Sequence, residues 1–151
     1  MNYLLHSPSQ IIARLLIDLG LGTLPLNPPL ASAVWPVYAS NEPSTPDNVL
    51  TIYDTVGLDH GRSMVTGEMF GPYGFQVRIR SVNHPTGYVK ADGIHREMCE
   101  GVYQETVHVD AVTYLVHCIS KVGDIMVLGK DPDSSRRLFT INAVAVINQV
   151  D

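Results

Sequence analysis

The stretch FQVRIRSV, residues 75–82, decides the fold class because apolar and polar side chains alternate strictly along it. One face would carry Phe75, Val77 and Ile79, and the other Gln76, Arg78 and Arg80. This two-residue period is typical of a strand that buries one face. The sequence therefore predicts a sheet with an apolar layer on one side and two neighbouring arginines on the other.

Further strands are expected on both sides of this stretch. Downstream, short β-rich runs are broken by glycine, aspartate and proline, which favours antiparallel pairing: TVHVDAV, TYLVHCISKV, IMVLG and RLFTINAVAVI. Upstream, VWPVYAS (34–40) and NVLTIYDT (48–55) are separated by NEPSTPD (41–47). Prolines and aspartate form turns, so these two runs predict a hairpin with a long acidic loop.

Two helices are expected. Ser7 and Pro8 form an N-cap and first-turn pair, and apolar residues then recur at helical spacing, so a helix is predicted from Pro8 to Leu19. A proline-rich connection follows. The second helix is predicted from Thr86 to Tyr103 because one side of it is apolar. That side comprises Tyr88, Ala91, Ile94, Met98 and Val102.

The order helix, strands, helix, strands predicts a single α+β domain with a mostly antiparallel or mixed sheet flanked by two helices. Residues 1–33 would form the N-terminal helix and its connection, and residues 34–151 the α+β core. The chain has 151 residues, 45% hydrophobic and 17% charged, which is typical of a globular domain.

Composition also limits the function. A formal net charge of -5 gives no basic footprint for wrapping nucleic acid, although a local basic patch is compatible with it. Two cysteines are too few for a disulfide scaffold, so reduced thiols in a cytosolic compartment are expected. No secretion signal and no membrane span is expected from the sequence.

The stretch GDIMVLGKDPDSSRRLFTIN, residues 123–142, superficially resembles a phosphate-binding loop. Such a loop needs four residues between the first glycine and Gly-Lys, then a hydroxyl residue and a helix. Here five residues intervene, Asp131 replaces the hydroxyl residue, and a strand pattern follows. The stretch instead predicts a hairpin whose turn is KDPDSS, and no nucleotide cofactor is expected.

Acid-base chemistry has one candidate set, Glu42, Asp47, Asp54, Asp59 and His60. A small hydrolase would use the last three of these residues. These residues lack a signature spacing such as HExxH, and solvated loop charges are the competing interpretation. No catalytic, metal or cofactor site is assigned from the sequence.

Charged surface patches are the remaining candidates. The two strand arginines would present guanidinium groups to another subunit or to a channel wall, and the acidic loop could supply carboxylates for them. The hairpin turn adds a second charged patch. The predicted subunit or tail-tube interface consists of Glu42, Asp47, Arg78, Arg80, Lys130, Asp131, Arg136 and Arg137.

The succession of these segments resembles the minor capsid and tail terminator proteins of long-tailed bacteriophages. The segments that carry the resemblance are VYASNEPSTPDNVLTIYDTVGLDHGR, GFQVRIRS, PTGYVKADGI and ISKVGDIMVLGKDPDSSRRLFTINAVAV, between Val34 and Val146. The hairpin with LGKD, the turn and LFTIN is the most specific of them.

The resemblance implies a structural virion protein without an active site or cofactor. It implies a ring, typically hexameric, at the head-proximal end of the tail tube, assembled in the host cytoplasm. The ring would contact the tail tube protein and the head connector, with DNA only passing through its lumen. A head completion or connector adaptor protein is the alternative within the virion, and a hydrolase is the alternative outside it.

Overall fold

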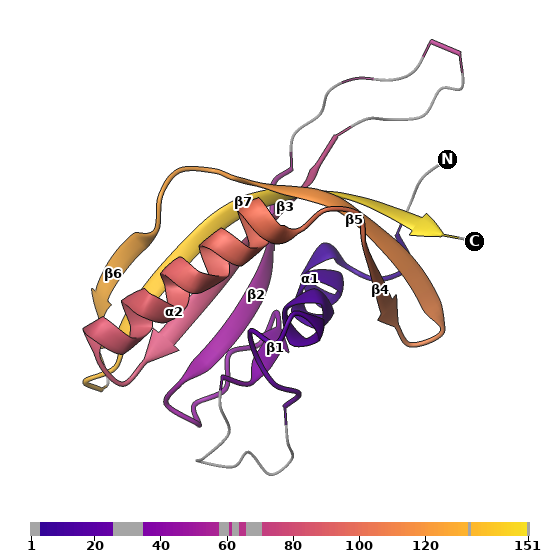
Figure 1. Ribbon diagram of the computed structural model, residues 1–151. Coiled ribbons are helices and arrows are strands. Elements are labelled where there is room, and N and C mark those ends of the chain that lie inside the picture. Colours follow the sequence, from indigo (N-terminus) through magenta and orange to yellow (C-terminus); the bar gives the residue numbers. More distant parts are fainter. Residues whose placement is uncertain are drawn as a thin grey trace.

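The computed structural model describes residues 4–25, 35–57, 61, 64–65, 71–132 and 134–150. The elements in chain order are α1 (Pro8–Asp18), β1 (Val37–Ala39), β2 (Val49–Thr55), β3 (Tyr73–Ser81), α2 (His84–Arg96), a π-helical turn (Glu97–Gly101), β4 (Glu105–Val109), β5 (Val112–Lys121), β6 (Met126–Lys130) and β7 (Arg137–Val150). The predicted α+β class is confirmed. Both helices pack against one curled, mixed sheet (Figure 1).

The sheet has the strand order β1-β2-β3-β7-β5-β4. β7 is its longest strand: β6 pairs with the first part of β7, and β5 pairs with the rest along the same side. Every pairing is antiparallel except that of β1 with β2. The antiparallel hairpin predicted from KDPDSS is present as β6 and β7, and the Asp131 amide donates to the Arg136 carbonyl at 2.7 Å across its turn.

The predicted hairpin between residues 34–40 and 48–55 is wrong, because β1 and β2 run parallel. β1 has only three residues and therefore spans about 10 Å. The nine residues between Ala39 and Val49 could extend about 30 Å, enough to return to the start of β1 before β2 begins. The length of the loop alone therefore allowed either parallel or antiparallel pairing of β1 with β2.

Helix α1 begins as predicted. The Ser7 side chain accepts from the Gln10 amide, the Gln10 side chain binds the Ser7 amide in return, and Pro8 needs no partner at the first helical position. Its buried apolar side chains are Ile11, Ile12, Ala13, Leu15 and Leu16.

Helix α2 begins two residues earlier than predicted. Asn83 is its N-cap and accepts from the Thr86 amide at 2.9 Å. The regular helix ends at Arg96, and the π-helical turn carries the chain onward to Gly101. Tyr88, predicted to face inward, is 45% exposed.

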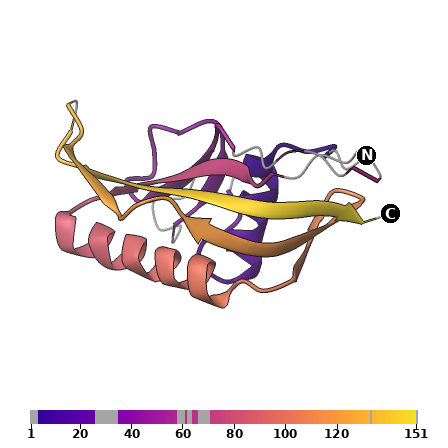
Figure 2. The ribbon, with the colours of Figure 1, turned by 90° about the horizontal axis from the view of Figure 1, so that it is seen from above.

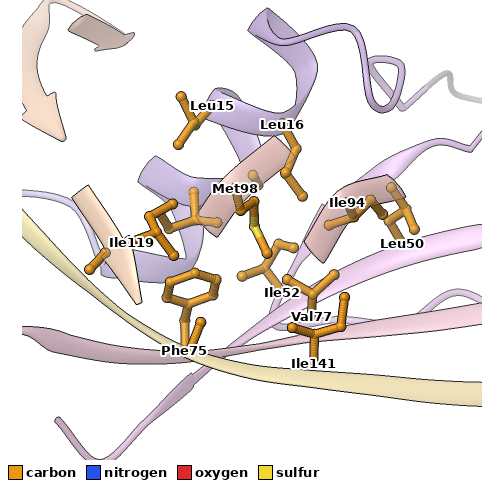
Figure 3. Packing of buried hydrophobic residues seen from close by; sticks show 14 of the residues in the cluster. Leu15, Leu16, Leu50, Ile52, Phe75, Val77, Ile94, Met98, Ile119 and Ile141 are labelled. Carbon is orange, nitrogen blue, oxygen red and sulfur yellow. The ribbon is translucent and has the colours of Figure 1, made fainter. Parts of the chain in front are cut away.

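The core lies between the helices and the inner face of the sheet. Phe75, Val77 and Ile79 point into it as the alternation of β3 predicted, and all three are fully buried. Figure 3 shows Phe75 and Val77 in one cluster with residues of α1, β2 and α2. The labelled residues are Leu15, Leu16, Leu50, Ile52, Phe75, Val77, Ile94, Met98, Ile119 and Ile141.

The two helices cover different parts of the sheet. α2 lies along β3 and β7 (Figure 2), whereas α1 packs against β1 and β2 on one side and β4 on the other. α1 thus lies between the two outer strands of the curled sheet (Figure 1). None of the helices in the described ranges has the length and apolarity needed to cross a membrane.

Candidate functional site: an arginine cluster at one end of the sheet

Six of the eight residues predicted as interface residues come together at one end of the sheet. They form the arginine cluster, which consists of Arg78, Arg80 and Arg136 with Glu42, Asp47 and Asp131. The cluster joins two segments far apart in the chain: the loop of residues 40–48, called here the acidic loop, and the β6–β7 turn of residues 131–136. It contains three guanidinium and three carboxylate groups, so their formal charges cancel.

Arg80 is the buried centre of the cluster, with only 3% of its surface exposed. Its guanidinium donates to the backbone carbonyls of Pro43 and Pro46 at 2.6 Å each, and to that of Asp47 at 3.3 Å. Burial, and then the nearby Arg136 charge, lower the pKa of Arg80 from its usual value. The prediction that both strand arginines are presented on an outer face is wrong for Arg80, because the acidic loop covers that end of the sheet.

Arg136 ties the β6–β7 turn to the acidic loop. Its Nη1 donates to the Ser44 carbonyl at 2.6 Å, and its Nη2 donates to Asp131 at 3.2 Å. The Ser134 hydroxyl accepts from its Nε at 2.9 Å, and Asp47 lies 3.7 Å away as an ion-pair partner. One side chain therefore bonds both segments, and the two loops form a single surface.

Arg78 lies two residues before Arg80 and is less enclosed. Its Nε is 3.5 Å from a Glu42 oxygen, and the same oxygen lies 3.9 Å from Arg80. Tyr53 stands beside this group, where burial and then the Glu42 charge raise the pKa of its phenol. The arginine–carboxylate pairing expected from the sequence is thus found within one chain.

Lys130 and Arg137 complete the set of predicted interface residues. They are register partners at the end of β6 and the start of β7, next to the arginine cluster. Lys130 is exposed and Arg137 is half-buried. Along the acidic loop, Ser40, Asn41, Ser44, Thr45 and Asp47 are exposed. Chemically, the site offers a pre-arranged polar surface; its role as an interface remains a prediction.

The hydrolase candidate Asp54 has a structural partner. Its two carboxylate oxygens accept from the amide and the hydroxyl of Ser9, at 2.8 Å each. Ser9 is fully buried in the first turn of α1, where a carboxylate is favourable to the helix dipole. Asp54 thereby attaches α1 to β2. Asp59 and His60, the other two hydrolase candidates, lie outside the described residues.

A second polar group, which the sequence analysis did not predict, attaches the segment just before α1 to the β4–β5 hairpin. The hydroxyl of fully buried Tyr114 lies 2.6 Å from Nδ1 of His6, and Nε2 of His6 lies 3.1 Å from Asp110. The His6 amide also donates to the Tyr114 oxygen at 3.0 Å. His6 is more than 100 positions away from both Tyr114 and Asp110 in the chain, so no local sequence pattern could have predicted these contacts.

One open hollow of about 490 Å³ is lined by Trp35, Pro85, Thr86, Val89 and Lys90. The Lys90 ammonium lies 5.5 Å from the centre of the Trp35 ring, a cation–π distance, and burial lowers its pKa. Over the described ranges, no three histidine, cysteine or acidic side chains gather in a way that could hold a metal ion.

No family model matches the chain, and no curated protein sequence matches it.

Proposed function

We propose that this protein is a structural virion subunit, the tail terminator of a long-tailed bacteriophage. It forms a ring, hexameric by the resemblance, on the head-proximal end of the tail tube, stops tube growth and receives the head connector. The observation that carries the proposal is the arginine cluster, because it holds two exposed loops in one pre-arranged polar surface. Surfaces of this kind bind other proteins without a large ordering cost.

A closed ring requires heterologous contacts, in which one surface of a subunit meets a different surface of the next. The acidic loop supplies one polar surface at the end of the sheet. The net charge of -5 supports transit of DNA through the lumen, because a strongly basic wall would retain phosphates.

The function is tested by deleting the gene and imaging the particles by electron microscopy. A terminator predicts overlong tubes and separate filled heads. A head-side adaptor predicts unstable heads and tubes of normal length. In parallel, purified protein is mixed with tail tubes, and a strict monomer that never caps tubes would contradict the proposal.

The contact surface is tested with substitutions that leave the cluster intact. Asn41→Arg and Ser44→Arg add bulk and charge to exposed side chains on the acidic loop. We expect tube capping or ring formation to be lost while the thermal unfolding midpoint stays unchanged. Ser120→Arg is the matched control, an exposed serine on β5, outside both loops of the cluster. If both loop variants form normal rings and cap tubes normally, the acidic loop is not a contact surface.

A further inference from the structure

In natural proteins the outer strands of a sheet are usually protected from pairing with other chains. Helix α1 packs against both β1 and β4. Beside β1, the chain also forms a parallel bridge between Thr23 and Pro36, and the Val37 amide donates to the Thr23 carbonyl at 3.0 Å. Both ends of the strand order therefore have helix α1 packed against them.

Strand β6 lies beside the strand order, not at either end of it. It pairs with β7 along one side, and no described residue pairs with its other side. Its first three side chains are apolar and about half exposed: Met126 52%, Val127 50% and Leu128 46%. The strand contains no proline, and a bulge between Val127 and Gly129 is its main irregularity. An apolar edge of this kind is a site for adding a further strand.

The apolar surface continues from β6 onto α2. Val127 pairs with Phe139 and so lies on the same face of the sheet as that ring, the face that α2 covers. Phe139 contacts His84 at 5.4 Å between ring centres, and His84 stacks on Tyr88, itself 45% exposed. Val127 and Tyr88 thus contribute apolar area to one side of the same open edge.

We propose that β6 pairs antiparallel with β6 of a second copy of this chain, about a two-fold axis at Val127. A charge at the end of β6 and one just before its start make this segment complementary to itself. Asp124 and Lys130 stand three residues before and three residues after Val127, so the axis brings Lys130 of one copy close to Asp124 of the other. The Asp124 side chain is 93% exposed, and its ion pair with Lys121 at 3.5 Å leaves it accessible.

This contact goes beyond the proposed function and is independent of it. A two-fold contact joins like surfaces, whereas ring closure needs unlike ones. If the chain forms rings through other surfaces, the β6 contact joins two rings face to face. If it forms none, the contact gives a dimer. Either way, loss of the contact halves the mass of the particle.

The experiment uses the two-fold axis itself. Val127→Lys places two lysines opposite each other at the axis, and Val127→Glu places two glutamates there. By sedimentation velocity, each variant alone is expected to have half the wild-type mass, with association at least about tenfold weaker because like charges meet. An equimolar mixture pairs lysine with glutamate and is expected to restore the wild-type mass.

Val89→Lys is the matched control, because Val89 is a 71% exposed valine on α2 that lines the hollow beside Trp35. It should keep the wild-type mass. An unchanged mass for either Val127 variant overturns the proposal, and so does a mixture that fails to restore the larger particle. Amide exchange of wild-type residues 126–128 gives a second measurement without substitution. Their exchange should slow as protein concentration rises, and concentration-independent exchange also overturns the proposal.

Discussion

Replacing Arg80 tests whether the arginine cluster holds the acidic loop. Arg80→Ala removes three hydrogen bonds from a charged donor to backbone carbonyls, two of them at 2.6 Å. Bonds to a charged group contribute about 1.5–3 kcal/mol each. The full sum overstates the effect, because the loop carbonyls regain water and the guanidinium no longer has to be desolvated. We expect the free energy of unfolding to fall by about 3 kcal/mol.

The assay is urea unfolding followed by far-UV circular dichroism and by the fluorescence of Trp35, the single tryptophan of the chain. Limited proteolysis gives a local readout. In the variant, cleavage within residues 40–48 should accelerate before global unfolding, since the loop has lost its donors while the sheet remains paired.

Arg78→Ala is the control on the same strand. Arg78 is 33% exposed at its side chain and meets Glu42 only at 3.5 Å, so its loss should cost less than about 1 kcal/mol. Equal destabilisation by the two substitutions, or an acidic loop that resists protease as well in Arg80→Ala as in the wild type, would refute the reasoning.

Three further outcomes are expected. Gly87→Ala should destabilise the fold by about 2 kcal/mol in urea unfolding, because the added methyl group would collide with the Phe139 ring. Gly93→Ala, in the same helix with open space around it, should instead stabilise by up to about 1 kcal/mol, and a loss of stability there would contradict this account. With a thiol reagent near pH 8, the exposed Cys118 should react well before Cys99, because burial raises the pKa of the Cys99 thiol. Labelling of both cysteines at the same rate would contradict this expectation.

Local patterns in the sequence predicted much of the fold. The inward side chains of β3, the N-terminus of α1 and the β6–β7 hairpin were all visible, because each depends on neighbours a few residues apart. The candidate residues at the hairpin turn and in the acidic loop were also found from charge and turn composition. The sequence showed which residues are charged, and the structure shows that six of them meet.

Cys118 shows where alternation fails. Tyr114 and Val116 point into the core, so continued alternation would bury Cys118 as well. A bulge between Val116 and Cys118 inserts one residue in β5 and turns Ile119 inward instead. No residue type marks this position, because a bulge depends on how the neighbouring strand is paired.

What the sequence by itself determined is the class of the fold and the periodic faces of its elements, since burial of one apolar face follows from local spacing. Only the tertiary structure decided the parallel direction of β1 and the burial of Arg80. Arg80 stands on the polar side of an alternating strand and would be solvated there. It is enclosed because carbonyls 33 to 37 residues away in the chain lie over it. Contacts at that separation depend on the path of the whole chain.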